Sequence, residues 1–345
     1  MRKLVIASRS KLAGKTSMSV GIARACGKKI GYIKPLGEKL IYVKKRLWDY
    51  DAALMSKMFG LCEDPEDMCL GLRHKKLSFI DSPEAAKERM IEKLNQVCSD
   101  KEVVLVETGH DLAYGSSVFL DAFSVTGYLD AKLIFVLSGE DIDIMDDVFI
   151  IKKILEHQDV DFGGVIINKV EDVEDFKQSY VEKIEALGIK VLGVLPYEAS
   201  LTHATVKYYS DQLAAKIVTG DTGMDGIVKN IFVGAMSANT FLHSDEAKEE
   251  NSMMITAGDR TDLILAAFEC KAACVILTNN VLPPPNIIQR AEDHKIPLLL
   301  VPLDTFATTK KIDDMEILIT ESDTGKIELL EQMVKQNVDL GSIID

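Results

Sequence analysis

The feature that most constrains the fold is an alternation of short β-branched runs with longer stretches of helical periodicity. The strand-like runs cover residues 4–7, 30–34, 103–107, 132–137, 165–168 and 191–195. The helical stretches between them cover residues 15–26, 51–59, 83–97, 143–156 and 173–187. Such alternation is typical of a parallel sheet with crossover helices. The first two hundred residues are therefore predicted to form an α/β domain with helices flanking a parallel sheet.

A second block with the same character begins near Thr202. Its expected strands cover 227–233, 253–256, 274–277 and 298–301, and its expected helices cover 206–217, 262–269 and 286–293. A chain of 345 residues exceeds the usual size of one domain. We therefore expect a first domain over 1–200, a smaller α/β domain over 201–325, and a C-terminal helix and tail over 326–345.

Charge and composition argue against several classes of partner. Forty Lys and Arg against 54 Asp and Glu give a net charge of −14, which repels nucleic acid and anionic membrane surfaces. No apolar stretch approaches the ~20 residues that span a membrane, and the N-terminus lacks a signal-peptide pattern. The six cysteines lack the spacing of a zinc site. A cytoplasmic protein that binds neither nucleic acid nor membrane is expected.

The strongest motif is the segment Ser8-Arg-Ser-Lys-Leu-Ala-Gly-Lys-Thr16, which lies between the first predicted strand and the first predicted helix. Backbone N–H groups of such a turn, together with the helix N-terminus, bind phosphate oxygens. Lys15 can reach the β and γ phosphates, and the Thr16 hydroxyl can join Mg²⁺. The candidate nucleotide-binding residues are Lys11, Gly14, Lys15, Thr16 and Ser17.

This loop departs from the usual pattern because Ser8 or Arg9 stands where a first glycine is expected. Side chains there can crowd a phosphate. The alternative is a degenerate loop that keeps its shape and has lost nucleotide affinity.

Two candidate polar residues lie at the end of the third predicted strand and in the loop after it. Glu107 ends a buried strand, where a carboxylate is costly unless it meets a metal ion or a cation. Loop capping is the alternative role for this carboxylate. His110 lies three residues later and can orient a substrate, although an isolated histidine is more often a solvated loop residue.

The loop, Gly31-Tyr-Ile-Lys-Pro-Leu-Gly37 and Val103-Val-Leu-Val-Glu-Thr-Gly109 together resemble dethiobiotin synthetase, a P-loop family with a parallel sheet. The resemblance implies that Lys34 is a phosphate or substrate cation acting with Lys15, and that Glu107 binds Mg²⁺. The family's glycine-rich acid loop is replaced here by Thr108-Gly-His-Asp111, so its substrate and reaction are not carried over.

Two further segments take roles from the same resemblance. Arg46-Leu-Trp-Asp-Tyr-Asp51 matches the place of a metal-binding aspartate, so Asp49 and Asp51 are both candidates, although a helix N-cap would explain one of them. Gly164-Val-Ile-Ile-Asn-Lys169 resembles the strand whose terminal Asn contacts adenine, which assigns that role to Asn168. A turn-forming asparagine is the alternative.

The second block contains Ala257-Gly-Asp-Arg-Thr-Asp262, with Leu201–Val206 before it and Asp304-Thr-Phe306 after it, and resembles a DRTGG domain. The pair of domains resembles the N-terminal part of long phosphotransacetylases, and the resemblance runs from about Lys3 to Thr309. It implies an acyltransferase partner and a homodimer or higher homo-oligomer, with Arg260 at an interface. An exposed arginine at a helix entry is the alternative role for Arg260. The acyltransferase domain itself is not expected in this chain.

Two functions follow from these observations, and enzymatic activity is left open between them. The first is an ATP-binding, Mg²⁺-dependent P-loop protein that hydrolyses ATP slowly or activates a carboxylate-like ligand. The second is a non-catalytic regulatory or assembly module in which nucleotide binding shifts a conformational equilibrium.

Overall fold

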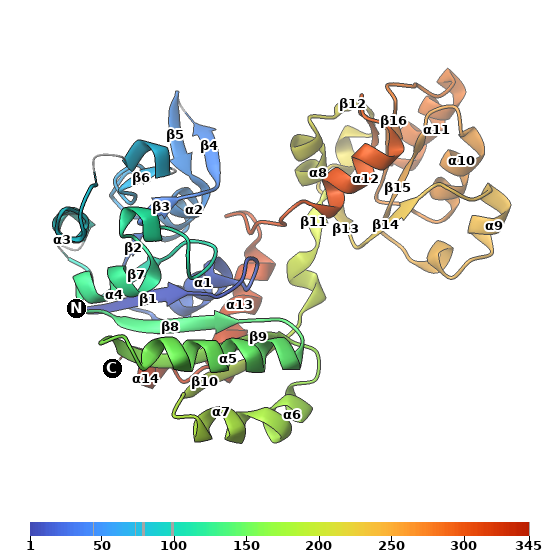
Figure 1. Cartoon of the computed structure of the whole chain (residues 1–345). Coiled ribbons are helices and arrows are strands. Elements are labelled where there is room, and N and C mark those ends of the chain that lie inside the picture. Colours follow the sequence, from blue (N-terminus) through green and yellow to red (C-terminus); the bar gives the residue numbers. More distant parts are fainter. Residues whose placement is uncertain (44, 73, 78–79, 98–99, 345) are drawn as a thin grey trace. The chain divides into compact units, whose positions relative to one another are not determined.

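The computed structural model describes residues 1–43, 45–72, 74–77, 80–97 and 100–344, and it divides into two units. Unit 1 comprises Met1–Glu198 and Ile319–Asp345, and unit 2 comprises Ala199–Leu318. The chain therefore leaves unit 1 for unit 2, and its C-terminal segment belongs to unit 1 again. Each unit contains a sheet with helices on both of its faces, so the predicted α/β class is confirmed for the chain (Figure 1).

Unit 1 is built on a six-stranded sheet of order β10-β9-β8-β1-β7-β2, in which every neighbouring pair is parallel. The strands are β1 (Arg2–Ala7), β2 (Ile30–Ile33), β7 (Val103–Glu107), β8 (Lys132–Leu137), β9 (Asp161–Val170) and β10 (Val191–Pro196). Central strands such as β7 are buried on both faces, which explains their uninterrupted apolar sequence. The carboxyl ends of β1 and β7 lie side by side, since Ile6 is in register with Glu107.

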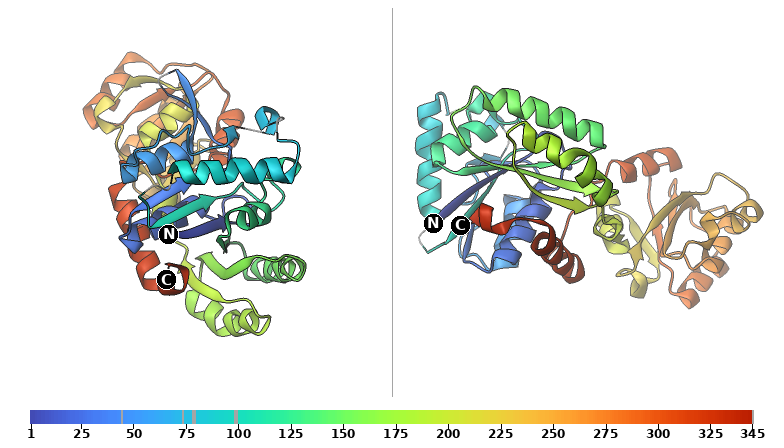
Figure 2. Two further views of the ribbon diagram at one scale, coloured as in Figure 1. Left: turned by 90° about the vertical axis from the view of Figure 1, so that its left-hand side faces the viewer. Right: turned by 90° about the horizontal axis from the view of Figure 1, so that it is seen from below.

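Helices cover both faces of this sheet (Figure 2). The helices of unit 1 are α1 (Lys15–Cys26), α2 (Tyr50–Phe59), α3 (Pro83–Val97), α4 (Ala122–Leu129), α5 (Asp141–Leu155), α6 (Val173–Phe176), α7 (Glu182–Ala186), α13 (Thr324–Asn337) and α14 (Leu340–Ile344). A π-helical turn over Lys177–Val181 joins α6 to α7. Buried residues of α3, α4, α5 and α7 form one core with the sheet, and α1 packs on the opposite face beside α13.

The C-terminal segment is fitted closely to α1. A Cβ on Gly21 would lie 2.6 Å from Val334 Cγ2, so the small residue allows α13 to approach α1. Arg24 Nε also pairs with Glu331 Oε2 at 3.0 Å. Because α1 follows the predicted phosphate loop, α13 stabilises the helix on which that loop depends.

Short strands connect β2 to α2 and α2 to α3. Strands β4 (Leu40–Val43) and β5 (Arg46–Asp49) form an antiparallel hairpin, and β3 (Leu36–Gly37) pairs with β6 (Gly71–Leu72). The sequence analysis did not predict this hairpin. The hairpin ends at Asp49, so it places Asp49 and Asp51 at the start of α2.

Unit 2 has a five-stranded sheet of order β12-β17-β16-β15-β14, parallel except for the edge strand β12. Its strands are β12 (Lys216–Thr219), β14 (Asn230–Val233), β15 (Ser252–Ala257), β16 (Cys274–Thr278) and β17 (Leu298–Leu300), and β11 (Ala204–Thr205) pairs with β13 (Ile227–Val228) apart from this sheet. Its helices are α8 (Val206–Leu213), α9 (Ala238–Leu242), α10 (Thr261–Glu269), α11 (Pro285–His294) and α12 (Thr305–Asp313).

Two predictions for unit 2 are wrong in detail. The expected helix over 206–217 ends at Leu213, because Ala214 adopts a left-handed conformation and the chain then enters β12. The expected strand over 227–233 is divided between β13 and β14, which belong to different sheets.

Candidate functional site

The predicted phosphate loop, residues 8–14, joins the carboxyl end of β1 to the first turn of α1. Gly14 lies at the helix N-cap with φ 96°, a left-handed conformation that favours glycine. Asn168 Nδ2 donates to the carbonyl of Ala13 at 2.9 Å, and Lys169 Nζ donates to the carbonyl of Leu12 at 2.8 Å. The end of β9 therefore fixes the shape of this loop.

A buried charge cluster lies next to the loop, and Lys34 is at its centre. Lys34 Nζ is 2.9 Å from Asp51 Oδ2 and 2.9 Å from Glu107 Oε1. The Lys34 side chain is 4% exposed and both carboxylate side chains are 1% exposed, so these three charges are almost entirely removed from water. Three elements far apart in sequence contribute to this cluster, since Lys34 follows β2, Asp51 lies in the first turn of α2 and Glu107 ends β7.

Glu107 is held from several sides. Thr16 Oγ1 lies 2.9 Å from Glu107 Oε1 and 3.3 Å from Asp51 Oδ1. Ser19 Oγ and Tyr32 Oη each donate to Glu107 Oε2 at 3.1 Å. The sequence analysis missed Ser19 and Tyr32. In the sequence, these residues are distinguished only by a polar side chain on an element that lies next to the site. That side chain points to a role in the site only once the register of β2 with β7 is known.

The cluster shifts the pKa values of its members. Burial alone lowers the pKa of Lys34, but Asp51 and Glu107 outweigh burial and raise it well above its usual value. Burial alone raises the pKa of Asp51, but Lys34 and Lys39 lower it below its usual value. Lys34 and Asp51 are therefore both charged at neutral pH, as expected for a buried ion pair with its hydrogen bonds satisfied.

Lys15 has a different environment. Its ammonium donates to Ser8 Oγ at 2.7 Å, and the residue is 8% exposed. Burial lowers the pKa of Lys15, although Glu107 opposes that shift. The hydroxyl of Ser8 therefore serves as a neutral acceptor for the predicted phosphate-binding lysine.

Asp49 caps helix α2. Its Oδ1 accepts from the N–H of Ala52 at 3.1 Å, and its Oδ2 accepts from the N–H groups of Glu38 at 2.9 Å and Lys39 at 3.3 Å. Burial and the neighbouring Asp51 charge raise the pKa of Asp49 to about 6. Of the two candidate aspartates, the structure brings Asp51 to Thr16 and Lys34, whereas Asp49 satisfies backbone donors.

The other predicted site residues lie along the loop and α1. Lys11 is exposed, and Ser17 is half-buried in the first turn of α1. Asn168 is 6% exposed, and its amide nitrogen contacts the loop backbone. Lys11 lies within the loop, Ser17 follows it on α1, and Asn168 holds the loop backbone from the end of β9.

The donor set fits a magnesium ion. Two carboxylates and one hydroxyl converge, and Mg²⁺ prefers such oxygen ligands, with waters and substrate phosphates completing its shell. Among the described residues there is no group of three or more His, Cys, Asp and Glu side chains that could hold a metal ion. A magnesium ion at this place would compete with the Lys34 ammonium for the two carboxylates.

His110 is more constrained than a solvated loop histidine. Glu38 Oε1 accepts from its backbone N–H at 2.8 Å, and Glu38 Oε2 lies 3.1 Å from its ring Nδ1. The ring packs on Tyr114 with centroids 4.2 Å apart. The carbonyl of His110 lies 3.3 Å from Ser8 Oγ, so this loop touches the predicted phosphate loop. The Glu38 contact was missed because 72 residues separate the partners.

In unit 2, Arg260 precedes α10 and is partly exposed. Its Nη2 donates to the carbonyl of Met236 at 2.9 Å, and its Nε lies 3.3 Å from Asp262 Oδ1. Arg260 thus ties the turn before α10 to the segment after β14.

A loop between a parallel strand and a helix, with a lysine and a hydroxyl at the helix start and a buried acid on the adjacent strand, defines a P-loop type α/β domain. Residues 2–205 match the AAA domain family, and residues 210–315 match the DRTGG domain. Because the first match covers more than half of the chain, the protein belongs to the AAA domain family and carries a DRTGG domain after it. The predicted DRTGG resemblance is confirmed.

Curated relatives point the same way. The chain is 24% identical to the phosphate acetyltransferase of Pseudomonas aeruginosa over 354 residues, covering 94% of this chain and 49% of that protein. It is 23% identical to the phosphate acetyltransferase of Synechocystis over 346 residues, covering 95% of this chain and 49% of that protein. These matches confirm the predicted resemblance to phosphotransacetylases. The chain spans about half the length of the curated relatives it matches.

Similarity to solved structures is more distant. A ParA family ATPase from Chlorobium tepidum is 13% identical with a TM-score of 0.38, covering 58% of this chain and 86% of that one. The CBS and DRTGG domains of a Clostridium perfringens pyrophosphatase, solved with diadenosine tetraphosphate, are 22% identical with a TM-score of 0.28, covering 39% of this chain and 60% of that one. No helix within the described ranges has the length and apolar character needed to cross a membrane.

Proposed function

We propose that this protein binds ATP together with Mg²⁺ at the loop formed by residues 8–14 and the adjoining charge cluster. The observation that carries the proposal is the convergence of Lys34, Asp51, Glu107 and Thr16, buried beside that loop. Buried charges are costly, and a cluster at the end of a parallel sheet is a frequent mark of a ligand site.

Each group has a role in this proposal. The backbone N–H groups before α1 bind the phosphates, and Lys15 moves from Ser8 Oγ to the β and γ phosphate oxygens. Thr16, Asp51 and Glu107 hold Mg²⁺, which neutralises charge on the phosphates when bound. Lys34 is released from the carboxylates and contacts a phosphate oxygen. Asn168 keeps the loop in its binding conformation and contacts the base.

Calorimetric titration with ATP, with and without Mg²⁺, tests this proposal. Wild type is expected to bind Mg²⁺-ATP, and Lys15→Ala is expected to bind at least ~10-fold more weakly, since it loses a charge-assisted contact. Lys87→Ala is the matched control, because this lysine lies on the exposed surface of α3. Absence of binding to wild type at millimolar ATP would refute the proposal and support a loop that keeps only its shape.

A protein that binds a nucleotide at this loop has two candidate functions. Slow hydrolysis or activation of a carboxylate-like ligand would use the metal set and Lys34 for charge neutralisation. A regulatory or assembly module is favoured by one specific observation: the hydroxyl of Ser8 accepts a hydrogen bond from Lys15, so the predicted phosphate-binding lysine is already held by its own loop. An acyltransferase partner and a homo-oligomer belong to this second candidate.

Phosphate release separates the two candidates. Steady release of inorganic phosphate that disappears in Glu107→Gln supports the enzymatic function. Binding without release in both proteins supports the module.

A further inference from the structure

Helix α5 carries an exposed stripe formed by Ile142, Asp146, Phe149, Lys153 and Glu156. The spacing of 4, 3, 4 and 3 residues places these side chains on one narrow face of the helix, the pattern of a helix-pairing seam. Ile142 is 69% exposed and Phe149 is 46% exposed. The opposite face of α5 is buried against the sheet through Ile144, Val148 and Ile151.

The charges of the stripe have no intramolecular ion-pair partner among the described residues. Asp147, one position beyond Asp146, pairs with Arg9 of the phosphate loop, but Asp146 and Lys153 enter no ion pair within the described ranges. The stripe therefore offers a partner two large apolar side chains, the opposite charges of Asp146 and Lys153, and the carboxylate of Glu156 at its C-terminal end.

The arrangement of the stripe is nearly symmetric about Phe149. Asp146 precedes it by three residues and Lys153 follows it by four, about 4.5 and 6 Å along the helix axis. If two copies of α5 pack antiparallel with the Phe149 side chains in contact, Asp146 of each copy lies beside Lys153 of the other. A parallel arrangement would instead oppose like charges.

We propose that the α5 stripe is a self-association surface, on which a second copy of this chain binds through an antiparallel, two-fold symmetric α5 pair. A closed dimer requires a surface that is complementary to itself, and Asp146 and Lys153 meet that requirement at the centre of the stripe, while Glu156 lies at its end opposite Ile142. Asp141 and Asp143 lie in the first turn of α5 and Lys152 and Lys153 lie in its last turn, and antiparallel packing also opposes the two helix dipoles favourably.

The size of the stripe sets the expected affinity. From Ile142 to Glu156 the helix rises about 21 Å, so one helix pair buries less than a standard interface of ~1,200–2,000 Å². A concentration-dependent dimer with a Kd in the micromolar range, around 10 µM, is therefore expected.

Sedimentation velocity over a concentration series up to about 200 µM tests the proposal. Wild type is expected to shift from monomer to dimer over the series. Phe149→Asp is expected to weaken the dimer by at least ~10-fold, because it places two carboxylates at the symmetry axis. Asp146→Lys and Lys153→Asp are each expected to weaken it several-fold, and the double variant to restore it to within ~3-fold of wild type.

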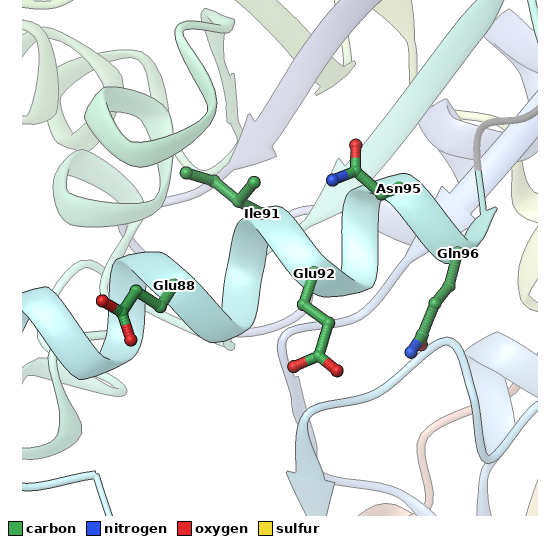
Figure 3. Close-up of a pocket in the computed structure, with 5 residues that line it drawn as sticks. All are labelled: Glu88, Ile91, Glu92, Asn95 and Gln96. Carbon is green, nitrogen blue, oxygen red and sulfur yellow. The ribbon is translucent and has the colours of Figure 1, made fainter.

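Helix α3 supplies the control. Its exposed surface is lined by Glu88, Ile91, Glu92, Asn95 and Gln96 (Figure 3). Ile91 is 38% exposed but stands among polar residues with no partner apolar residue in this set, so Ile91→Asp is expected to leave the dimer unchanged. All substitutions lie on exposed positions, and far-ultraviolet circular dichroism checks that each variant is folded.

Three results would overturn the proposal. The first is a wild type that remains monomeric over the whole series. The second is an assembly of any size that persists in Phe149→Asp. The third is a double charge variant no stronger than its single variants, because this would show that Asp146 and Lys153 do not face one another. None of these measurements depends on nucleotide binding.

Discussion

Replacement of Lys34 by Met tests the buried charge cluster. The ammonium of Lys34 contacts two carboxylates at 2.9 Å, and its removal leaves Asp51 and Glu107 buried without that cation. Each contact is worth about 6 kcal/mol of gross Coulomb energy at an effective dielectric constant of ~20, and the cost of desolvation cancels part of it. Breaking a buried pair costs ~3–5 kcal/mol in practice. The free energy of unfolding should fall by that amount.

Urea denaturation followed by tryptophan fluorescence measures this loss. The chain has one tryptophan, Trp48 on β5, so its fluorescence reports on unit 1. Lys39→Met is the control, because Lys39 lies 3.9 Å from Asp51 Oδ1 and its side chain is 27% exposed; it should cost less than ~1 kcal/mol. The loss in Lys34→Met should also shrink at low pH, where an unpaired buried carboxylate takes up a proton.

A double variant makes the test specific. Asp51→Asn should cost at least ~1 kcal/mol less in the Lys34→Met background than in wild type, because the charge that it removes is then uncompensated. If Lys34→Met destabilises unit 1 no more than Lys39→Met does, the buried cluster is not the stabilising feature described above.

Three further predictions concern the same unit. Asp49 has a folded pKa of about 6, above its unfolded value, so its contribution to stability is present at low pH and is lost as pH rises through 6. Between pH 7 and pH 5, wild type should therefore gain about 1.4 kcal/mol in unfolding free energy relative to Asp49→Asn; equal gains in urea titrations would contradict this shift. Ser8→Gly removes the acceptor of Lys15 and should tighten ATP binding several-fold in calorimetry, and weaker binding would instead assign Ser8 to the site. Leu330→Ala on α13 empties a fully buried position and should cost ~2–5 kcal/mol when followed by Trp48 fluorescence, whereas no loss would show that α13 does not support α1.

The sequence was sufficient to predict the elements that carry local signals. Helix α1 begins and ends as predicted because Gly14 and Gly27 both adopt left-handed conformations at its ends. Strand β7 was predicted because a short, continuous run of apolar residues is typical of a parallel strand buried on both faces. The β4 and β5 hairpin lacks the usual sequence signal, because the two residues between its strands are Lys44 and Lys45 rather than a glycine-containing turn pair.

The remaining features depend on pairs that are distant in sequence. Ser19 and Tyr32 bond to Glu107 only because β2 and α1 are both adjacent to β7. The packing of α13 on α1 joins residues about three hundred positions apart, and neither Gly21 nor Val334 carries a local sign of that contact. Local periodicity specifies which face of a helix is buried, but it does not specify which helix covers it.

Hydrogen–deuterium exchange in the presence of Mg²⁺-ATP tests most directly whether a nucleotide binds at the loop before α1. Phosphate binding by backbone N–H groups should slow exchange in peptides covering residues 8–19 of wild type, and should not do so in Lys15→Ala. Unchanged exchange over residues 8–19 at an ATP concentration that saturates wild type in calorimetry would place the nucleotide elsewhere and contradict the proposed function.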